Sequence, residues 1–239
     1  MHDKLHEGST VRVRGPRNHF PLVGSPRYLF IAGGIGITPM MPMIAAGEAA
    51  GVDWRLLYGG RSRSSMAFVD DLQRHGDRVT VCARDAQDGT NFRTNLGSAL
   101  SAPGESTLVY CCGPEGLLSA VEEACKTWPA DSLHIERFSA KALEEPSPEA
   151  LDTFEVECQR SGQALTVPQS KSIYEVCEEA GVDVLGSCME GVCGTCECDI
   201  IEGEGDHRDS VLNDAEKAAN QTMMICVSRS RSERLVLDL

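Results

Sequence analysis

The chain has 239 residues, of which 41% are hydrophobic, and a formal net charge of −14. A chain of this length fits two ordinary domains. No apolar run approaches the roughly 20 residues that a membrane-spanning helix needs, and the N-terminus shows no pattern of a secretion signal. We therefore expect a cytoplasmic protein without a membrane partner.

The negative charge is concentrated in the C-terminal part of the chain. Residues 153–239 hold 7 Lys and Arg against 17 Asp and Glu, so that this part carries −10 and the remainder −4. Nucleic acid is itself an anion, and the charge disfavours it as a partner. The same field would steer a basic protein surface toward the C-terminal part, although a solvated acidic surface that only aids solubility is the plain alternative.

Strand-like and helical segments alternate over residues 28–126. Strands are expected at 28–32, 54–58, 79–82 and 107–112, and helices at 39–50, 65–75 and 115–126. Such alternation predicts a parallel sheet with helices on both faces. A sheet of this kind binds ligands at the carboxyl ends of its strands.

A boundary is expected at residues 139–152, where two prolines and several acidic residues interrupt the apolar pattern. Beyond it, alternating apolar residues predict a hairpin at 154–167, and a capping box at 172–175 predicts the start of a helix. Strands are expected at 198–202 and 235–239. Hairpin, helix and returning strands together predict a small α+β domain of the β-grasp type.

Four cysteines have the spacing C-x4-C-x2-C followed by a fourth after 29 residues, namely Cys188, Cys193, Cys196 and Cys226. This is the plant-type spacing for a 2Fe-2S cluster. Gly191 and Gly194 would let the backbone approach the cluster and offer N–H groups to its sulfurs. Structural zinc is the alternative, but zinc prefers paired C-x2-C knuckles or Cys and His mixtures, and no second C-x2-C is present.

Three further cysteines of this part need another role. Cys198 would give C-x4-C-x4-C if it replaced Cys196, and we interpret it as a spare thiol. Cys158 and Cys177 fall at apolar-face positions, which favours small core residues.

Two strand-to-helix junctions are candidates for nucleotide binding. The first is GGIGITP at residues 33–39, where glycines allow a tight turn and the helix N-terminus can accept a pyrophosphate. The second is YCCGPE at residues 110–115. For Cys112 within it, the plain alternative is a buried residue at the end of a strand.

These motifs together resemble the phthalate dioxygenase reductase family, which belongs to the wider ferredoxin-NADP reductase superfamily. The similar segments are GPRNHFPL at 15–22, IAGGIGITPM at 31–40, YCCGPEGL at 110–117, ERF at 136–138, DHRDSVL at 206–212 and MICVSRSRS at 224–232. The resemblance implies an α/β Rossmann-like nicotinamide-binding domain at 23–138, a linker at 139–152 and an α+β β-grasp 2Fe-2S ferredoxin domain at 153–239.

The resemblance also implies roles for single residues. The dinucleotide pyrophosphate loop would consist of Gly33, Gly34, Gly36, Thr38 and Pro39. The residues nearest the reacting rings would be Cys112 and Gly113 beside the nicotinamide, and Phe138 next to the isoalloxazine.

Family members open with an FMN-binding barrel, and residues 1–22 resemble only its last strand. A nicotinamide delivers two electrons as hydride whereas a 2Fe-2S cluster takes one at a time, so FMN must stand between them, supplied by the missing barrel or by another chain. The resemblance implies electron transfer from NAD(P)H through FMN to the cluster and on to an oxygenase, either Rieske-type or a haem-thiolate monooxygenase. The alternatives are a non-enzymatic carrier served by a separate flavoprotein and a zinc-stabilised scaffold.

The turn after the second strand bears on the choice between NADH and NADPH. NAD specificity usually needs a carboxylate here for the ribose 2′-hydroxyl, whereas NADP needs donors for its phosphate. The chain instead has Arg61, Ser62 and Arg63, with no acidic residue before Asp70. We predict that NADPH binds at least as tightly as NADH. A solvated turn whose arginines contact nothing is the alternative.

Overall fold

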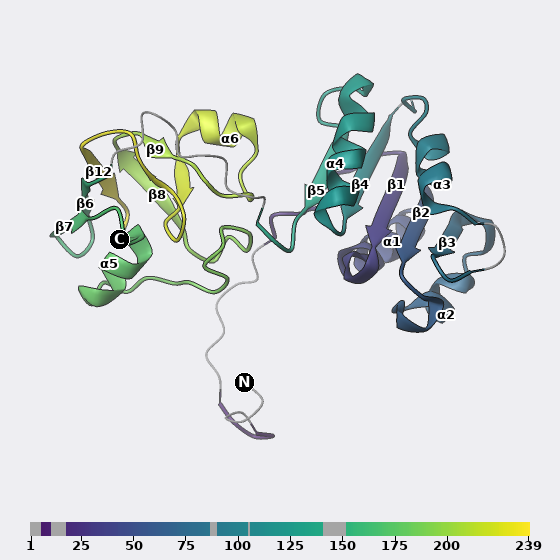
Figure 1. Ribbon diagram of the computed structural model, residues 1–239, viewed down its shortest axis with the longest axis horizontal. Helices are drawn as coiled ribbons and strands as arrows, with labels where there is room; N and C mark the ends of the chain where they lie inside the picture. Colours follow the sequence, from purple (N-terminus) through teal and green to yellow (C-terminus); the bar gives the residue numbers. More distant parts are fainter. Residues whose placement is uncertain (1–5, 11–17, 87–89, 105, 141–151) are drawn as a thin grey trace.

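The computed structural model describes residues 6–10, 18–86, 90–104, 106–140 and 152–239. These residues form two units that lie side by side along the long axis of the molecule (Figure 1). Most of the expected linker at 139–152, and most of the expected barrel strand within 1–22, lies outside the described residues.

The first unit is built on a five-stranded sheet in which all neighbouring strands run parallel. Its order is β3-β2-β1-β4-β5, formed by β1 at Arg27–Gly33, β2 at Asp53–Gly60, β3 at Val79–Ala83, β4 at Thr107–Cys112 and β5 at Leu133–Glu136. The β1 strand takes the central place because it is apolar on both faces and buried at every position after the first.

Helices cover both faces of this sheet (Figure 1). They are α1 at Ile37–Ala50, α2 at Val69–Gln73, α3 at Phe92–Ala99 and α4 at Glu115–Ala124. Apolar residues of α1 and α2 pack on one face, and those of α3 and α4 pack on the other. The predicted parallel sheet with helices on both faces is confirmed.

The α1 helix begins two residues before its predicted start and ends as predicted. A 3-10 turn at Gly34–Gly36 leads directly into it, and Pro39 is tolerated in the first helical turn because the N–H groups there have no intrahelical partner. At the other end, Gly51 adopts a left-handed conformation with φ of 66°, which terminates the helix.

The helix predicted at 65–75 is wrong in extent. The structure has a 3-10 turn at Arg63–Ser65 and then the short α2, because Phe68 between them takes a left-handed φ of 59°. The α3 helix and β5 were not predicted. The start of α3 is marked by Asn91, whose side chain accepts a hydrogen bond from the N–H of Thr94 at 3.1 Å.

The segment before β1 is fastened to the sheet by two tyrosines. We call residues 20–25 the N-terminal strap. The hydroxyl of Tyr110 accepts a hydrogen bond from the N–H of Val23 at 2.7 Å and donates to the carbonyl of Pro21 at 3.1 Å. The hydroxyl of Tyr28 bonds the strap backbone twice in the same way, at 2.8 and 2.9 Å. The strap is therefore held at four backbone atoms.

The second unit contains a mixed sheet of order β10-β8-β12-β6-β7 and a two-stranded sheet of β11 and β9. The strands are β6 at Phe154–Cys158, β7 at Gln163–Val167, β8 at Glu197–Glu202, β9 at Gly205–Asp206, β10 at Thr222–Met224, β11 at Arg229–Ser230 and β12 at Arg234–Leu237. The predicted hairpin of β6 and β7 is confirmed, and its turn contains Gly162 at φ of 67°.

Two helices of the second unit start with capping boxes. The predicted box at Ser172 and Glu175 is confirmed at the start of α5, Ile173–Glu179. A second box, formed by Asn213 and Glu216, starts α6 at Asp214–Ala219 and was not predicted. In the described part of the chain, no helix combines the length and apolar character required to cross a bilayer.

Candidate functional site

The four predicted cluster cysteines lie on one loop and the segment facing it. The loop runs between α5 and β8, and its backbone turns through left-handed conformations at Met189, Gly191 and Gly194. A Cβ atom on Gly191 would lie 2.6 Å from a methyl carbon of Val227, so no side chain fits there without displacing its neighbours. The glycines are thus required both by backbone angle and by space.

The thiols of these cysteines form two pairs. The thiol of Cys188 lies beside that of Cys193, and the thiol of Cys196 lies beside that of Cys226. In a 2Fe-2S cluster each of the two irons takes two thiolates, so two neighbouring pairs of thiols are the arrangement that such a cluster uses.

Hydrogen-bond donors surround the thiols. The N–H of Glu190 lies 3.4 Å from the sulfur of Cys188, and the N–H of Thr195 lies 3.5 Å from the sulfur of Cys193. The Cys193 thiol in turn donates to the hydroxyl of Thr195 at 3.2 Å. Donors of this kind stabilise the thiolate, which is the form of cysteine that binds iron, and the sulfur of a cluster.

Sequence reasoning missed Asp209, which braces the turn beside this loop, where the N–H of Ser210 donates to the carbonyl of Gly191 at 2.9 Å. Its carboxylate accepts hydrogen bonds from the N–H groups of Val211 and Leu212, at 3.0 and 2.8 Å. Its carbonyl accepts from the Lys217 ammonium group at 2.7 Å, and the side chain is 4% exposed. The similarity of DHRDSVL to the family pointed to this segment but not to its bracing role.

The other cysteines of this unit lie in its core. Cys158 and Cys177 are fully buried with their sulfurs 3.9 Å apart, which confirms them as core residues. Cys198 lies on β8, and its thiol is 3.6 Å from the carbonyl oxygen of Asp199.

In the first unit, the two predicted nucleotide junctions pack backbone against backbone. A Cβ atom on Gly36 would lie 2.1 Å from the carbonyl oxygen of Cys112. A Cβ on Gly33 would lie 2.7 Å from the ring of Pro114, and one on Gly113 would lie 3.0 Å from the Cα of Gly33. The structure therefore brings the carboxyl ends of β1 and β4 together, with glycine required on both sides.

The start of α1 is the candidate site for the pyrophosphate. Its N-cap is Gly36, which provides no side-chain cap, and its first turn contains no acidic residue. The hydroxyl of Thr38 donates to the carbonyl of Ile35 at 2.9 Å, and Pro39 follows within the helix. An uncapped helix N-terminus without negative charge suits a phosphate group.

The residues predicted beside the reacting rings differ in exposure. Cys112 is fully buried, and burial together with the nearby carboxylate of Glu136 raises the pKa of its thiol to about 12. The thiol is therefore uncharged at neutral pH. Phe138 lies two residues beyond the end of β5 and is 46% exposed.

The turn predicted to determine the preference for NADH or NADPH follows β2. Arg61 and Arg63 are exposed there, and the hydroxyl of Ser62 donates to that of Ser65 at 2.8 Å. The backbone N–H of Arg63 donates to the carboxylate of Asp85 at 3.2 Å. Sequence reasoning missed Asp85 because it follows β3, the neighbouring strand of the sheet, rather than β2.

Comparison with known proteins adds two domain assignments. Residues 30–123 match the family model for an oxidoreductase NAD-binding domain, and residues 156–231 match that for a 2Fe-2S iron-sulfur cluster binding domain. Both matches lie within the two units described above.

The chain is similar to known proteins along essentially its whole length. It is 42% identical to the phenoxybenzoate dioxygenase subunit beta of Ectopseudomonas oleovorans over 240 residues, which is 100% of this chain and 73% of the relative. It is 38% identical to the phthalate dioxygenase reductase of Burkholderia cepacia over 241 residues, covering 99% and 73% of the two chains.

A solved structure is similar along the full length. The chain matches an intact type IV self-sufficient cytochrome P450 monooxygenase with a TM-score of 0.84 and 45% identity, covering 100% of this chain and 31% of that one. The chain thus spans about a third of that protein. Together the matches confirm the predicted fold class and the predicted class of protein, an oxidoreductase with NAD-binding and 2Fe-2S domains.

The close contact at Gly36 generates a prediction. Gly36→Ala should lower the free energy of unfolding by about 2 kcal/mol, because the new methyl group overlaps the carbonyl of Cys112 and the two segments must separate. Urea unfolding measures the change. Gly97→Ala is the matched control, since Gly97 lies in α3 with open space around it, and alanine there should stabilise by about 0.5–1 kcal/mol. Equal effects of the two substitutions would contradict the contact.

Proposed function

The chain belongs to the phthalate dioxygenase reductase family, and on that premise we propose that it passes electrons from NADPH, through FMN, to a 2Fe-2S cluster and on to an oxygenase. The observation that carries the proposal is the pairing of the cluster-loop thiols in a chain whose other unit presents an uncapped, glycine-lined helix start.

The first unit, which we call the nucleotide-binding unit, would hold NADPH across the carboxyl ends of β1 and β4. The N–H groups at Gly34, Gly36 and Thr38 would bind the pyrophosphate, because the helix start has no side-chain cap and its first turn carries no acidic residue. Cys112 would border the nicotinamide as a neutral, buried thiol.

FMN, when bound, accepts the hydride as one two-electron step and releases the electrons singly, which is the form that a 2Fe-2S cluster accepts. Phe138 is the described residue that we propose contacts the flavin, since it is an exposed aromatic side chain at the end of the nucleotide-binding unit. The remainder of the flavin site would come from a barrel or from another chain.

The cluster would be held by the two thiol pairs. Cys188 and Cys193 would bind one iron, and Cys196 and Cys226 the other. The cluster, when bound, would supply a one-electron carrier on the loop. The relatives and the P450 structure favour either a Rieske-type oxygenase or a haem-thiolate monooxygenase as the acceptor.

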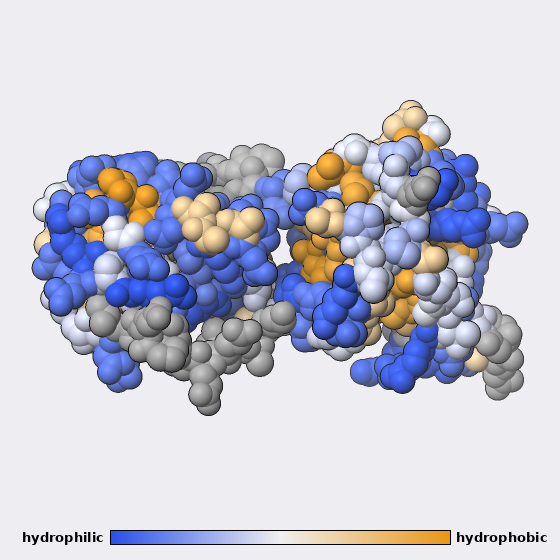
Figure 2. All heavy atoms as spheres, turned by 90° about the horizontal axis from the view of Figure 1, so that it is seen from above, coloured by the Kyte–Doolittle hydropathy of each residue, from blue (hydrophilic) through white to orange (hydrophobic). Residues whose placement is uncertain are grey.

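The acceptor would dock through a basic surface. The part from 153 to 239 carries −10, and the view in Figure 2 shows mostly hydrophilic side chains over this unit. Opposite charge on the partner would raise the rate of encounter and align the two redox centres.

A visible spectrum recorded anaerobically before and after NADPH addition tests the function, with added FMN in a parallel sample. We expect a 2Fe-2S spectrum at the start and bleaching by NADPH when flavin is bound. Absence of iron and labile sulfide from the reconstituted chain would refute the proposal. Reduction only after a separate flavoprotein reductase is added would indicate a carrier.

The ligand assignment predicts the outcome of Cys→Ser substitutions. Replacing any of the four proposed ligands should abolish the cluster spectrum and destabilise the C-terminal unit, because metal binding and folding are coupled. Iron content and circular dichroism measure both effects. Cys198→Ser is the control and should retain iron, since that thiol bonds the carbonyl of Asp199. Loss of iron in Cys198→Ser, with retention in Cys196→Ser, would reverse the assignment.

The turn after β2 predicts the cofactor preference. Arg61→Ala or Arg63→Ala should weaken NADPH binding selectively, by about 1.5–3 kcal/mol if a charge-assisted bond to the 2′-phosphate is lost. Calorimetric titration of NADPH and NADH into both variants measures this. Arg93→Ala, an exposed arginine of α3, is the control. Equal losses for the two cofactors, or tighter binding of NADH by the wild type, would contradict the prediction.

The charge of the C-terminal part predicts a salt effect. Electron delivery to the oxygenase should slow as ionic strength rises, because counterions screen attraction between surface charges beyond about 10 Å at 0.1 M. Stopped-flow rates over a salt series measure this. Reduction of a small neutral acceptor should stay constant, and a salt-independent rate to the oxygenase would remove the steering argument.

A further inference from the structure

The two units meet at a contact between His19 and Gly194, which the proposed function does not use. A Cβ atom on Gly194, in the cluster loop, would lie 2.2 Å from Nε2 of His19 and 2.7 Å from its Cδ2. The imidazole of His19 therefore occupies the space where any other residue at 194 would place its side chain. His19 precedes the nucleotide-binding unit in the chain, so this contact joins the two units.

His19 is itself exposed, and the backbone around it is held by its neighbours. The N–H of Phe20 donates to the side-chain oxygen of Asn18 at 3.0 Å, which forms a tight turn with His19 at its apex. Phe20 is 6% exposed and packs edge-on against Tyr110 with ring centroids 5.3 Å apart. The N-terminal strap then continues along the sheet, held by its four hydrogen bonds.

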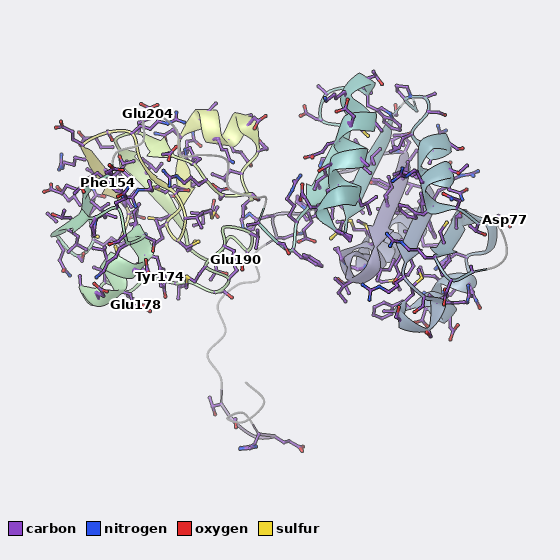
Figure 3. The ribbon with its side chains drawn as sticks, in the orientation of Figure 1. Asp77, Phe154, Tyr174, Glu178, Glu190 and Glu204 are labelled. Atoms are coloured by element: carbon purple, nitrogen blue, oxygen red, sulfur yellow. The ribbon has the colours of Figure 1, made fainter. Side chains whose placement is uncertain are left out.

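The arrangement of the two units has support outside this contact. The TM-score of 0.84 with the cytochrome P450 structure covers 100% of the chain, and a two-unit chain reaches such a value when both units and their relative placement are similar. Figure 3 places Glu190, on the same loop as Gly194, on the side of the cluster-binding unit that faces the nucleotide-binding unit.

We propose that His19 is a positioning residue, which holds the cluster loop against the nucleotide-binding unit by filling the space that Gly194 leaves open. The proposal rests on the proposed function only in assuming that the loop carries a cluster. Two properties make the contact specific for glycine at position 194. Glycine is the only amino acid without a Cβ atom, and the strap holds the backbone that carries the imidazole.

The first test is the effect of the cluster on the histidine ring signals in nuclear magnetic resonance. The chain has six histidines, and selective labelling with assignment by His19→Ala identifies the signal of His19. In the dithionite-reduced, cluster-loaded chain, the paramagnetic cluster should broaden this signal. His75 is the internal control, because its neighbour Asp77 lies at the far end of the nucleotide-binding unit (Figure 3), and its signal should stay sharp.

The second test is a double-mutant cycle on retention of the cluster absorbance in urea. Gly194→Ala should shorten the half-life about tenfold by overpacking against the imidazole, and His19→Ala in the same chain should restore most of it. Gly162→Ala is the matched control, since Gly162 has φ of 67° against 66° for Gly194 but open space around it. His19→Gln should behave more like wild type than His19→Ala does.

The outcomes separate the two proposals. A cluster-loaded chain with a sharp His19 signal, or additive effects of His19→Ala and Gly194→Ala, would overturn the role of His19 and leave the proposed function intact. Failure to load a cluster would refute the proposed function. In that case, a nuclear Overhauser contact between the His19 ring and the Gly194 Cα protons would still support the positioning contact, and its absence would overturn it.

Discussion

The contact between Gly36 and the carbonyl of Cys112 is the constraint on which the nucleotide-binding unit depends. It brings the turn that follows β1 against the end of β4, close to where α1 and α4 begin. Segments that meet this closely leave no room for side chains at their contact, so backbone N–H groups can face a ligand there. Aromatic residues on one face of the sheet, including Phe30 and Trp54, form part of the core beneath it.

The C-terminal unit is held together differently. Its core contains few aromatic residues and includes a buried cation, Arg229, which is 8% exposed. The guanidinium donates to the carbonyls of Lys171 and Asp152 at 2.9 and 2.8 Å and lies over the ring of Phe154 at 5.1 Å. Burial lowers the pKa of this group, and the carbonyls offset the desolvation cost by satisfying its donors. Such a unit would gain further stability if a cluster linked its loop to the segment at Cys226, as we propose.

Sequence patterns predicted those parts of the molecule that local chemistry controls. The capping box at Ser172, the glycine that ends α1 and the C-x4-C-x2-C part of the cysteine motif all act over a few residues. Features set by the tertiary fold were missed. The carboxylate of Asp85 reaches the turn at Arg63 from a neighbouring strand, and the left-handed Phe68 breaks a helix that the apolar pattern favoured. The burial of Asp209, whose bonds to Val211 and Leu212 are local, likewise arises only in the folded chain.

The place of β12 in the second sheet has a consequence for synthesis. This strand lies between β8 and β6, at the centre of the sheet, although its residues follow all four cluster cysteines in the chain. The ribosome therefore delivers the thiols before the strand that completes their support. Until then the nascent loop is open to oxidants and to competing metals. The support of the proposed cluster loop is therefore complete only once β12 has paired with β8 and β6.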